Sequence, residues 1–136
     1  MTELTTDPGA LTAVVTVDRA RLVDYANASG DQNPIHQDEE FARSVGLQDV
    51  IAHGMWTMGA ALDVVTAYVG GDPGRILSCA TRFTGMVVVP AGQTVEVLVE
   101  GTVTKSDEEA GTQTLDLTAT CAGEKVLGRC QAVVRA

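Results

Sequence analysis

The protein has 136 residues, of which 45% are apolar and 20% are charged, and its nine basic and eighteen acidic side chains give a net charge of −9. This length suits one domain with a single hydrophobic core, and the balance of apolar and charged residues excludes an intrinsically disordered chain. The acidic charge argues against duplex nucleic-acid binding, which needs a basic face, and no apolar run reaches the ~18 residues of a membrane-spanning helix.

The first ten residues are polar and end in Pro8-Gly9, so we expect residues 1–10 to be a flexible leader and residues 11–136 to form the domain. The leader is acidic and lacks the apolar segment of a secretory signal. Three cysteines are widely spaced without a Cys-x-x-Cys pair, namely Cys79, Cys121 and Cys130. Their odd number and spacing predict free thiols in a cytoplasmic protein rather than a disulfide framework or a zinc site.

The first half of the domain reads as one strand followed by helices. Residues 11–17 are rich in Val and Thr and predict a strand, and Asp18 is a typical N-cap for a helix that runs to about residue 28. Residues 29–37 have the composition of a loop, and a short helix follows from Asp38 to Gly46. Residues 54–69 predict a longer helix that is apolar or small on most sides and therefore buried.

The second half reads as four strands. Val, Thr and Leu dominate residues 76–89, 94–104, 112–121 and 125–134, and apolar and polar residues alternate along residues 95–100. The breaks between these segments resemble hairpin connections and predict antiparallel pairing. The order indicates an α+β domain in which an antiparallel sheet wraps a long helix. One helix covers such a sheet incompletely, which leaves room for a second subunit.

The loop at residues 29–37 carries the most chemistry. Asp31 and His36 lie five residues apart, and Gly30 and the Asn33-Pro34 pair restrict the backbone around them. A carboxylate held beside an imidazole can act as a general acid–base pair. An ordinary turn, with Asp31 capping backbone N–H groups and His36 facing solvent, explains the same residue types.

A longer pattern favours the acid–base pair. Residues 25–38, Tyr-Ala-Asn-Ala-Ser-Gly-Asp-Gln-Asn-Pro-Ile-His-Gln-Asp, resemble the hydratase-2 motif of the MaoC-like dehydratase family. Residues 51–55, Ile-Ala-His-Gly-Met, resemble the segment that leads into the central helix of this family, and Arg82-Phe83-Thr84 resembles its usual strand motif. Within the family, the resemblance is greatest to the catalytic B subunit of a two-subunit (3R)-hydroxyacyl-acyl carrier protein dehydratase.

The resemblance implies a hot-dog fold and the reversible dehydration of (3R)-hydroxyacyl thioesters to trans-2-enoyl thioesters, in type II fatty acid synthesis. It implies that Asp31 and His36 are the catalytic residues. His36 is the candidate base at C2, and Asp31 is the candidate group that protonates the departing hydroxyl or holds the water, although the two roles can be shared or exchanged. We expect Asn33 to orient the loop.

Gly54 stands at the start of the long helix, where free N–H groups and the helix dipole suit a developing oxyanion. The resemblance assigns the oxyanion donor to the same residue, whereas a glycine that merely permits the turn is the alternative. We expect His53 to support the loop. Two histidines without a cysteine partner predict no metal site, and the reaction needs no cofactor other than the acyl-CoA or acyl carrier protein thioester itself.

Two other functions are open at this stage. A hot-dog thioesterase would use an acid such as Asp63 in the long helix, and a non-catalytic acyl-binding subunit would need neither Asp31 nor His36. We expect a homodimer, or a heterodimer with a second hot-dog subunit, and no nucleic-acid or membrane partner. The net charge of −9 matches acidic acyl carrier protein poorly unless a basic patch lies at the docking site. No motif indicates the length of the acyl chain, whether its carrier is CoA or acyl carrier protein, or the physiological direction of the reaction.

Overall fold

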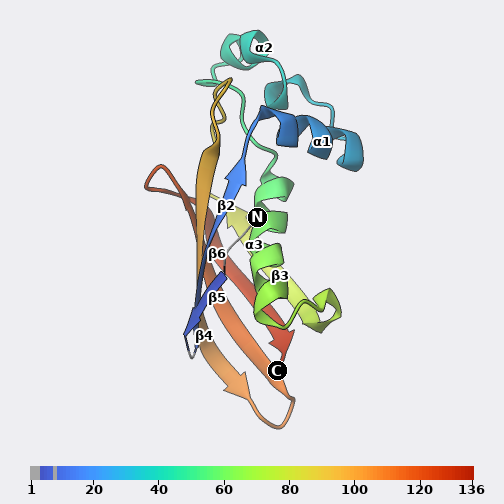
Figure 1. The fold of residues 1–136 in the computed structure, drawn as a ribbon, viewed down its shortest axis with the longest axis vertical. Helices are drawn as coiled ribbons and strands as arrows, with labels where there is room; N and C mark the ends of the chain where they lie inside the picture. The colour runs from blue at the N-terminus through green and yellow to red at the C-terminus, as the bar shows by residue number, and fades with distance from the viewer. Residues whose placement is uncertain (1–3, 8) are drawn as a thin grey trace.

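The computed structural model describes residues 4–7 and 9–136, and its six strands form a single antiparallel sheet (Figure 1). The strands are β1 (Leu4–Asp7), β2 (Ala10–Val17), β3 (Ile76–Phe83), β4 (Val95–Asp107), β5 (Thr112–Cys121) and β6 (Glu124–Arg135). Their order across the sheet is β1-β2-β4-β5-β6-β3. The helices are α1 (Arg19–Ser29), α2 (Glu39–Ser44) and α3 (Gly54–Tyr68), with short 3₁₀ turns η1 (Pro34–His36) and η2 (Pro73–Arg75).

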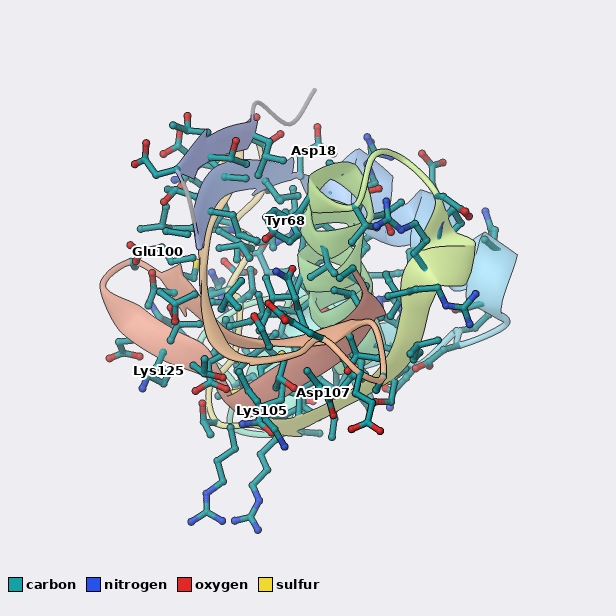
Figure 2. The ribbon with its side chains drawn as sticks, turned by 90° about the horizontal axis from the view of Figure 1, so that it is seen from below. Asp18, Tyr68, Glu100, Lys105, Asp107 and Lys125 are labelled. Carbon is teal, nitrogen blue, oxygen red and sulfur yellow. The ribbon has the colours of Figure 1, made fainter. Side chains whose placement is uncertain are left out.

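Helix α3 lies in the concave face of the curved sheet, as the apolar composition of residues 54–69 predicted. Figure 2 looks along the long axis and shows the sheet bending around α3, with Tyr68 on the inner side and Glu100 and Lys125 on the outer side. The core-facing residues of α3 include Trp56, Ala61, Val64 and Val65, each at most 9% exposed. Burial of each such valine contributes roughly 1.5–3 kcal/mol, so this face holds the helix against the sheet.

The N-terminal segment corrects one prediction. Residues 4–7, which we expected in a flexible leader, form β1 and pair with residues 10–13 of β2. Gly9 adopts a left-handed conformation with φ 78°, which allows the tight reversal between the two strands. The rest of the predicted leader, residues 1–3 and 8, lies outside the described residues.

The prediction of one strand over residues 76–89 is also wrong. Its second half does not continue the strand, and the strand does not pair with the next one along the chain. β3 ends at Phe83, and Gly85 then passes so close to β6 that a Cβ there would lie 2.8 Å from the Lys125 carbonyl oxygen. Residues 87–89 pair instead with residues 50–52, through the Ala52 N–H to Val87 and the Val89 N–H to Val50. β3 therefore pairs with β6 at the far edge, and residues 90–92 do not form the hairpin that we predicted.

The three cysteines are free, as their spacing predicted. Burial raises the pKa of the Cys79 thiol to about 11, and it raises the pKa of Cys121 and Cys130 as well. These thiols therefore remain neutral and unreactive near neutral pH. Among the described residues, no helix combines the length and the apolar character needed to cross a membrane.

Candidate active site

Local hydrogen bonds shape the loop that follows α1. Helix α1 ends at Ser29, and Gly30 takes the left-handed conformation (φ 83°) while its N–H donates to the Ala26 carbonyl. The Asp31 N–H then donates to the Ser29 hydroxyl oxygen at 3.2 Å, and Asp31 Oδ1 accepts from the Asn33 N–H at 3.1 Å. The Asp31 carboxylate is therefore held by the turn that it caps, with Oδ2 left for another partner.

Asn33 and Pro34 begin the short 3₁₀ turn that positions His36. Asn33 Oδ1 accepts from the Ile35 N–H at 3.2 Å and caps η1, at the end of which His36 stands. The His36 Nδ1 lies 2.7 Å from the Ile51 carbonyl oxygen. Because a carbonyl only accepts, Nδ1 carries the hydrogen, and neutral His36 has its lone pair on Nε2. The turn thus sets the tautomer as well as the position of the imidazole.

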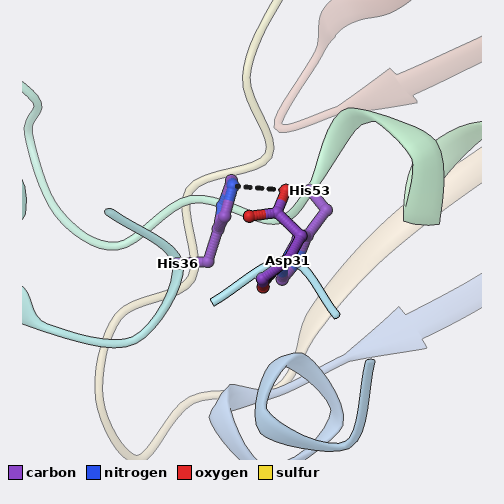
Figure 3. A group of neighbouring side chains, drawn as sticks. All are labelled: Asp31, His36 and His53. Atoms are coloured by element: carbon purple, nitrogen blue, oxygen red, sulfur yellow. Dashed lines mark hydrogen bonds and ion pairs between the residues drawn. The ribbon is translucent and has the colours of Figure 1, made fainter. Parts of the chain in front are cut away.

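The lone pair of His36 faces the carboxylate of Asp31. Nε2 of His36 lies 4.0 Å from Oδ2 of Asp31, as the dashed line in Figure 3 marks. The Asp31 side chain is 54% exposed, whereas that of His36 is 9% exposed. The ordinary-turn interpretation predicted the reverse for His36, a ring in solvent. A buried imidazole beside an accessible carboxylate leaves one open side for a substrate.

Burial is the main influence on the protonation of His36. It disfavours the charged ring and lowers the pKa of His36 below 6.5. The hydrogen bond to Ile51 opposes this shift in pKa, the neighbouring His53 adds to it, and the Asp31 carboxylate opposes it. His36 is consequently neutral near pH 7, which is the form that a general base requires.

His53 contacts both members of the pair. Its ring is 2% exposed and stacks on the ring of His36, with centroids 3.8 Å apart and planes inclined by 22°. Its Nε2 donates to the Asp31 main-chain oxygen at 3.1 Å, and the ring of Tyr25 from α1 makes a T-shaped contact with it, with centroids 4.8 Å apart. The sequence placed His53 beside the loop, and the structure brings it directly against both residues.

These three side chains also form a group of potential metal ligands. One ligand atom from each of Asp31, His36 and His53 lies within 4.8 Å of the others. The lone pair of an imidazole nitrogen lies in the plane of its ring, and the lone pairs of two stacked, nearly parallel rings lie in separate planes and do not converge well on one ion. The arrangement therefore suits a metal poorly and keeps His36 available for proton transfer.

Gly54 begins α3 immediately after His53. Asp or Asn side chains cap the starts of α1, η1, α2 and η2, but the side chain of His53 makes no capping hydrogen bond at the start of α3. A Cβ on Gly54 would lie 3.1 Å from the ring of Phe83, so glycine also makes room for that ring. The first turn of α3 thus presents uncapped N–H groups next to His53, where an oxyanion can accept from them.

Asp63, the acid considered for a thioesterase, lies elsewhere. It is exposed on α3 and lines a cavity of about 440 Å³ together with Arg21, Tyr25 and Trp56. Ten residues separate it from His53 along the helix, a rise of about 15 Å. Asp63 therefore does not join the Asp31–His36 pair.

Sequence reasoning missed a buried carboxylate that supports the site. Asp49 is 8% exposed, and its Oδ1 accepts from Arg19 at 2.7 Å and from the Val50 N–H at 2.7 Å. Arg43 of α2 lies 3.6 Å from its other oxygen. No periodicity marks Asp49, since its partners lie on separate elements. The network ties α1 and α2 to the segment that presents Ile51 and His53.

Comparison with known proteins places this geometry in a family. The family model for the MaoC like domain matches residues 4–121. Over 77 residues the chain is 43% identical to "Fatty acid synthase beta subunit TOXC" of Cochliobolus carbonum, covering 56% of this chain and 4% of the relative. Over 90 residues it is 36% identical to "Probable enoyl-CoA hydratase 2" of Dictyostelium discoideum, covering 65% and 30%. The chain thus spans less than a third of each of these two curated relatives.

Solved structures share the whole fold. A structure described as a MaoC-like dehydratase has a TM-score of 0.89 and 34% identity, with 98% of this chain and 39% of that chain covered. R-hydratase PhaJ1 from Pseudomonas aeruginosa has a TM-score of 0.79 and 27% identity, with 94% and 80% covered. The expected α+β hot-dog architecture is confirmed.

Proposed function

Because the chain belongs to the MaoC-like domain family, we propose that it catalyses the reversible dehydration of (3R)-hydroxyacyl thioesters to trans-2-enoyl thioesters. One observation carries the proposal most directly. The buried His36 has its Nε2 lone pair 4.0 Å from the Asp31 carboxylate, and that carboxylate is accessible from outside. The relatives named as a hydratase and an R-hydratase support the same activity.

The spacing between His36 and Asp31 suits a water molecule or a hydroxyl group. Nε2 and Oδ2 are both acceptors, and a water oxygen can lie at hydrogen-bond distance, roughly 2.8 Å, from each across a 4.0 Å gap. A water between them donates one hydrogen to each and directs a lone pair outward. In the hydration direction, that lone pair attacks C3 of the enoyl thioester.

In the dehydration direction the same atoms run in reverse. Nε2 of His36 removes the C2 proton, and the electron pair is taken up by the thioester oxygen as an enolate. The pair then returns to form the C2–C3 double bond as the C3 hydroxyl departs. The imidazolium returns its proton to the departing hydroxyl, so one molecule of water is released and His36 is neutral again. Asp31 stabilises the transient imidazolium and holds the water, and Asn33 keeps Asp31 and η1 in place.

The thioester oxygen needs donors while C2 carries negative charge. We assign this role to the N–H of Gly54, which lies at the uncapped start of α3 and directly follows His53. Fixed main-chain donors at a helix N-terminus stabilise an oxyanion without reorganisation. The absence of a side chain at Gly54 leaves this donor open to the thioester, and the Phe83 ring lies on the side toward which a Cβ would point.

The protein is proposed to work as a dimer, with itself or with a second hot-dog subunit. Among the described strands, β3 pairs on one side only, with β6, and therefore has a free edge. The apolar side chains on and near this edge are about half exposed, namely Met55, Leu77, Phe83 and Met86. An edge strand bordered by apolar side chains is the surface that a second sheet covers. Sedimentation of the purified chain tests this, and a fully active monomer would contradict it.

The remaining features of the proposal concern substrate and location. The substrate is an acyl-CoA or acyl carrier protein thioester, and no further cofactor, metal, nucleic acid or membrane takes part. The relative named as a fatty acid synthase subunit favours a place in fatty acid synthesis. The three free thiols favour the cytoplasm, where thiols stay reduced.

The decisive experiment is a spectrophotometric hydratase assay with trans-2-enoyl-CoA substrates of several chain lengths, followed by analysis of product chirality. The proposal expects loss of the enoyl absorbance and formation of the (3R)-hydroxyacyl product. Release of free thiol at a comparable rate would instead identify a thioesterase. No reaction with any chain length, on CoA or on acyl carrier protein, would favour a non-catalytic acyl-binding subunit.

A further inference from the structure

We propose that His53 is a positioning residue whose single ring sets the relative geometry of Asp31 and His36. The inference rests on the proposed function, since it takes Asp31 and His36 as the reacting pair. His53 itself is 2% exposed and does not reach the open side of the site, so it acts through the other two residues.

The first contact fixes Asp31. Nε2 of His53 lies 3.1 Å from the main-chain oxygen of Asp31, and a carbonyl accepts only, so Nε2 carries the hydrogen. This bond spans 22 residues of sequence and ties the loop after α1 to the start of α3. The other bonds near Asp31, from Asp31 to Ser29 and from Asn33 to Asp31, lie within the loop. The His53 bond therefore anchors the loop to the rest of the site.

The second contact fixes the plane of His36. The Ile51 carbonyl holds one atom of the His36 ring, Nδ1, but a single bond permits the ring to tilt about it. The stacked ring of His53, 3.8 Å away and inclined by 22°, blocks that tilt on one face. Nε2 then stays directed at Asp31, and the edge of Tyr25 holds His53 in turn.

The third observation is an unpaired polar atom of His53, which is unfavourable and which packing does not explain. Nδ1 of His53 is buried and has no hydrogen-bond partner among the described residues. Buried polar atoms are nearly always paired, and an unpaired one calls for an explanation. His53 also occupies the N-cap of α3 without capping it, where Asp, Ser or Asn would stabilise the helix. Neither burial nor capping favours a histidine at this position, whereas a ring with one N–H both donates to Asp31 and stacks on His36.

The structure makes a direct prediction about tautomers. His36 carries its hydrogen on Nδ1 and His53 carries its hydrogen on Nε2, so the stacked rings hold opposite tautomers. Nitrogen-15 chemical shifts of the histidine rings in the wild-type protein report these tautomers without any substitution or substrate. A His53 with its hydrogen on Nδ1 would overturn the proposal, even if the hydratase activity is found.

The functional test uses His53→Phe and His53→Gln. Phenylalanine keeps a buried flat ring against His36 but lacks the donor to Asp31, and glutamine keeps a donor but lacks the stack. Each variant is expected to lose about 10- to 100-fold in kcat with KM within about twofold, because misplacement of the pair affects reaction more than binding. The matched control is Val64→Ala, on the buried face of the same helix, which lowers the melting temperature but leaves kcat within about twofold.

A double-mutant cycle with Asp31→Asn separates positioning from general disturbance. If His53 acts through Asp31, His53→Phe costs at most about threefold in the Asp31→Asn background instead of 10- to 100-fold. Equal losses in both backgrounds would overturn the proposal, as would a kcat loss in Val64→Ala of the same size. A wild-type protein without hydratase activity would refute the proposed function alone, while the tautomer measurement would still decide whether His53 holds Asp31.

Discussion

Asp31 and Asp49 are two carboxylates in this part of the molecule, and their surroundings differ in opposite ways. Asp49 is buried, with Arg19 and the Val50 N–H each at 2.7 Å and Arg43 at 3.6 Å. Asp31 is exposed, and among residues 4–7 and 9–136 the partner of its Oδ2 is the His36 ring at 4.0 Å. Both lie next to the same segment, residues 50–53, which presents the Ile51 carbonyl and the His53 ring.

The difference suits Asp49 to a structural role and leaves Asp31 available to a substrate. A buried carboxylate whose Oδ1 accepts from a guanidinium and from a main-chain N–H is shielded from a substrate, and it holds its elements together. A carboxylate that caps one turn with Oδ1 and leaves Oδ2 free can accept a hydrogen bond from water or from a hydroxyl. Substitution of Asp31 should therefore lower turnover, whereas substitution of Asp49 should lower stability.

The largest effect on turnover is expected at the exposed pair. Asp31→Asn and His36→Ala should each lower kcat by roughly 10²–10⁴-fold, the usual range for the loss of a general acid or base. The melting temperature should change little for Asp31→Asn, because its side chain is 54% exposed and the amide oxygen still caps Asn33. A steady-state assay with a crotonyl thioester, together with thermal melting, checks both. Near-native turnover in either variant would contradict the assignment.

A second large effect is expected at the start of α3. Gly54→Val should lower kcat/KM by about 10²–10³-fold, because the side chain blocks the thioester from a main-chain donor that is still present. Since a Cβ at residue 54 would also press on the Phe83 ring at 3.1 Å, the double variant Gly54→Val/Phe83→Ala is the control. Removal of the ring should not restore turnover. Recovery to the rate of Phe83→Ala would show that the loss came from crowding of Phe83.

The buried carboxylate should behave in the opposite way. Asp49→Ala removes the nearest carboxylate of the partly buried Arg19, which keeps the Val89 carbonyl and Glu39 at 3.6 Å. We therefore expect a loss of about 2–3 kcal/mol in the free energy of unfolding, below the upper range for a buried ion pair. Urea titration measures this loss. At a temperature where the variant is folded, kcat should stay within about tenfold of wild type. A larger loss of turnover with unchanged stability would contradict the structural role that we assign to Asp49.

The same contrast explains what the sequence predicted well. Local rules predicted local structure: Asp18 and Asp38 cap α1 and α2 with their side chains, and residues 112–121 form β5 as expected. The sequence predicted a loop at Asp31, Asn33 and His36 from its composition, and the resemblance to the MaoC-like family, rather than the spacing, favoured an acid–base pair there. The side-chain bonds of Asp31 and Asn33 form within this loop, which a sequence pattern can encode, whereas the His36 ring bonds to Ile51, 15 residues later.

The failures involve partners that are distant in sequence. β3 pairs with β6 and not with β4, and Gly85 just after it passes close to Lys125, about 40 residues later. The Arg19–Asp49 bond joins two elements 30 residues apart, and no spacing rule encodes it. The burial of His53 depends on Tyr25, His36 and the sheet together. Such contacts follow from tertiary packing, which propensity and periodicity do not describe.

The smallest predicted effect is a shift in the pH profile, and it distinguishes the two acids once more. His36 must be neutral to accept the C2 proton, and burial lowers its pKa below 6.5, so the acid limb of kcat/KM should have its midpoint below pH 6.5. The carboxylate of Asp31 opposes this shift, because a negative charge favours the imidazolium. Removal of that charge in Asp31→Asn should therefore move the midpoint of its residual activity to a still lower pH.

The control is Asp49→Asn, which removes a charge that is already paired with Arg19. Asp49 is not among the groups that shift the pKa of His36, so the midpoint of this variant should match that of wild type. Profiles of kcat/KM from pH 5 to 8 for the three proteins test the order. A midpoint that rises in Asp31→Asn, or one that moves equally in both variants, would show that Asp31 does not act on His36 across the 4.0 Å gap.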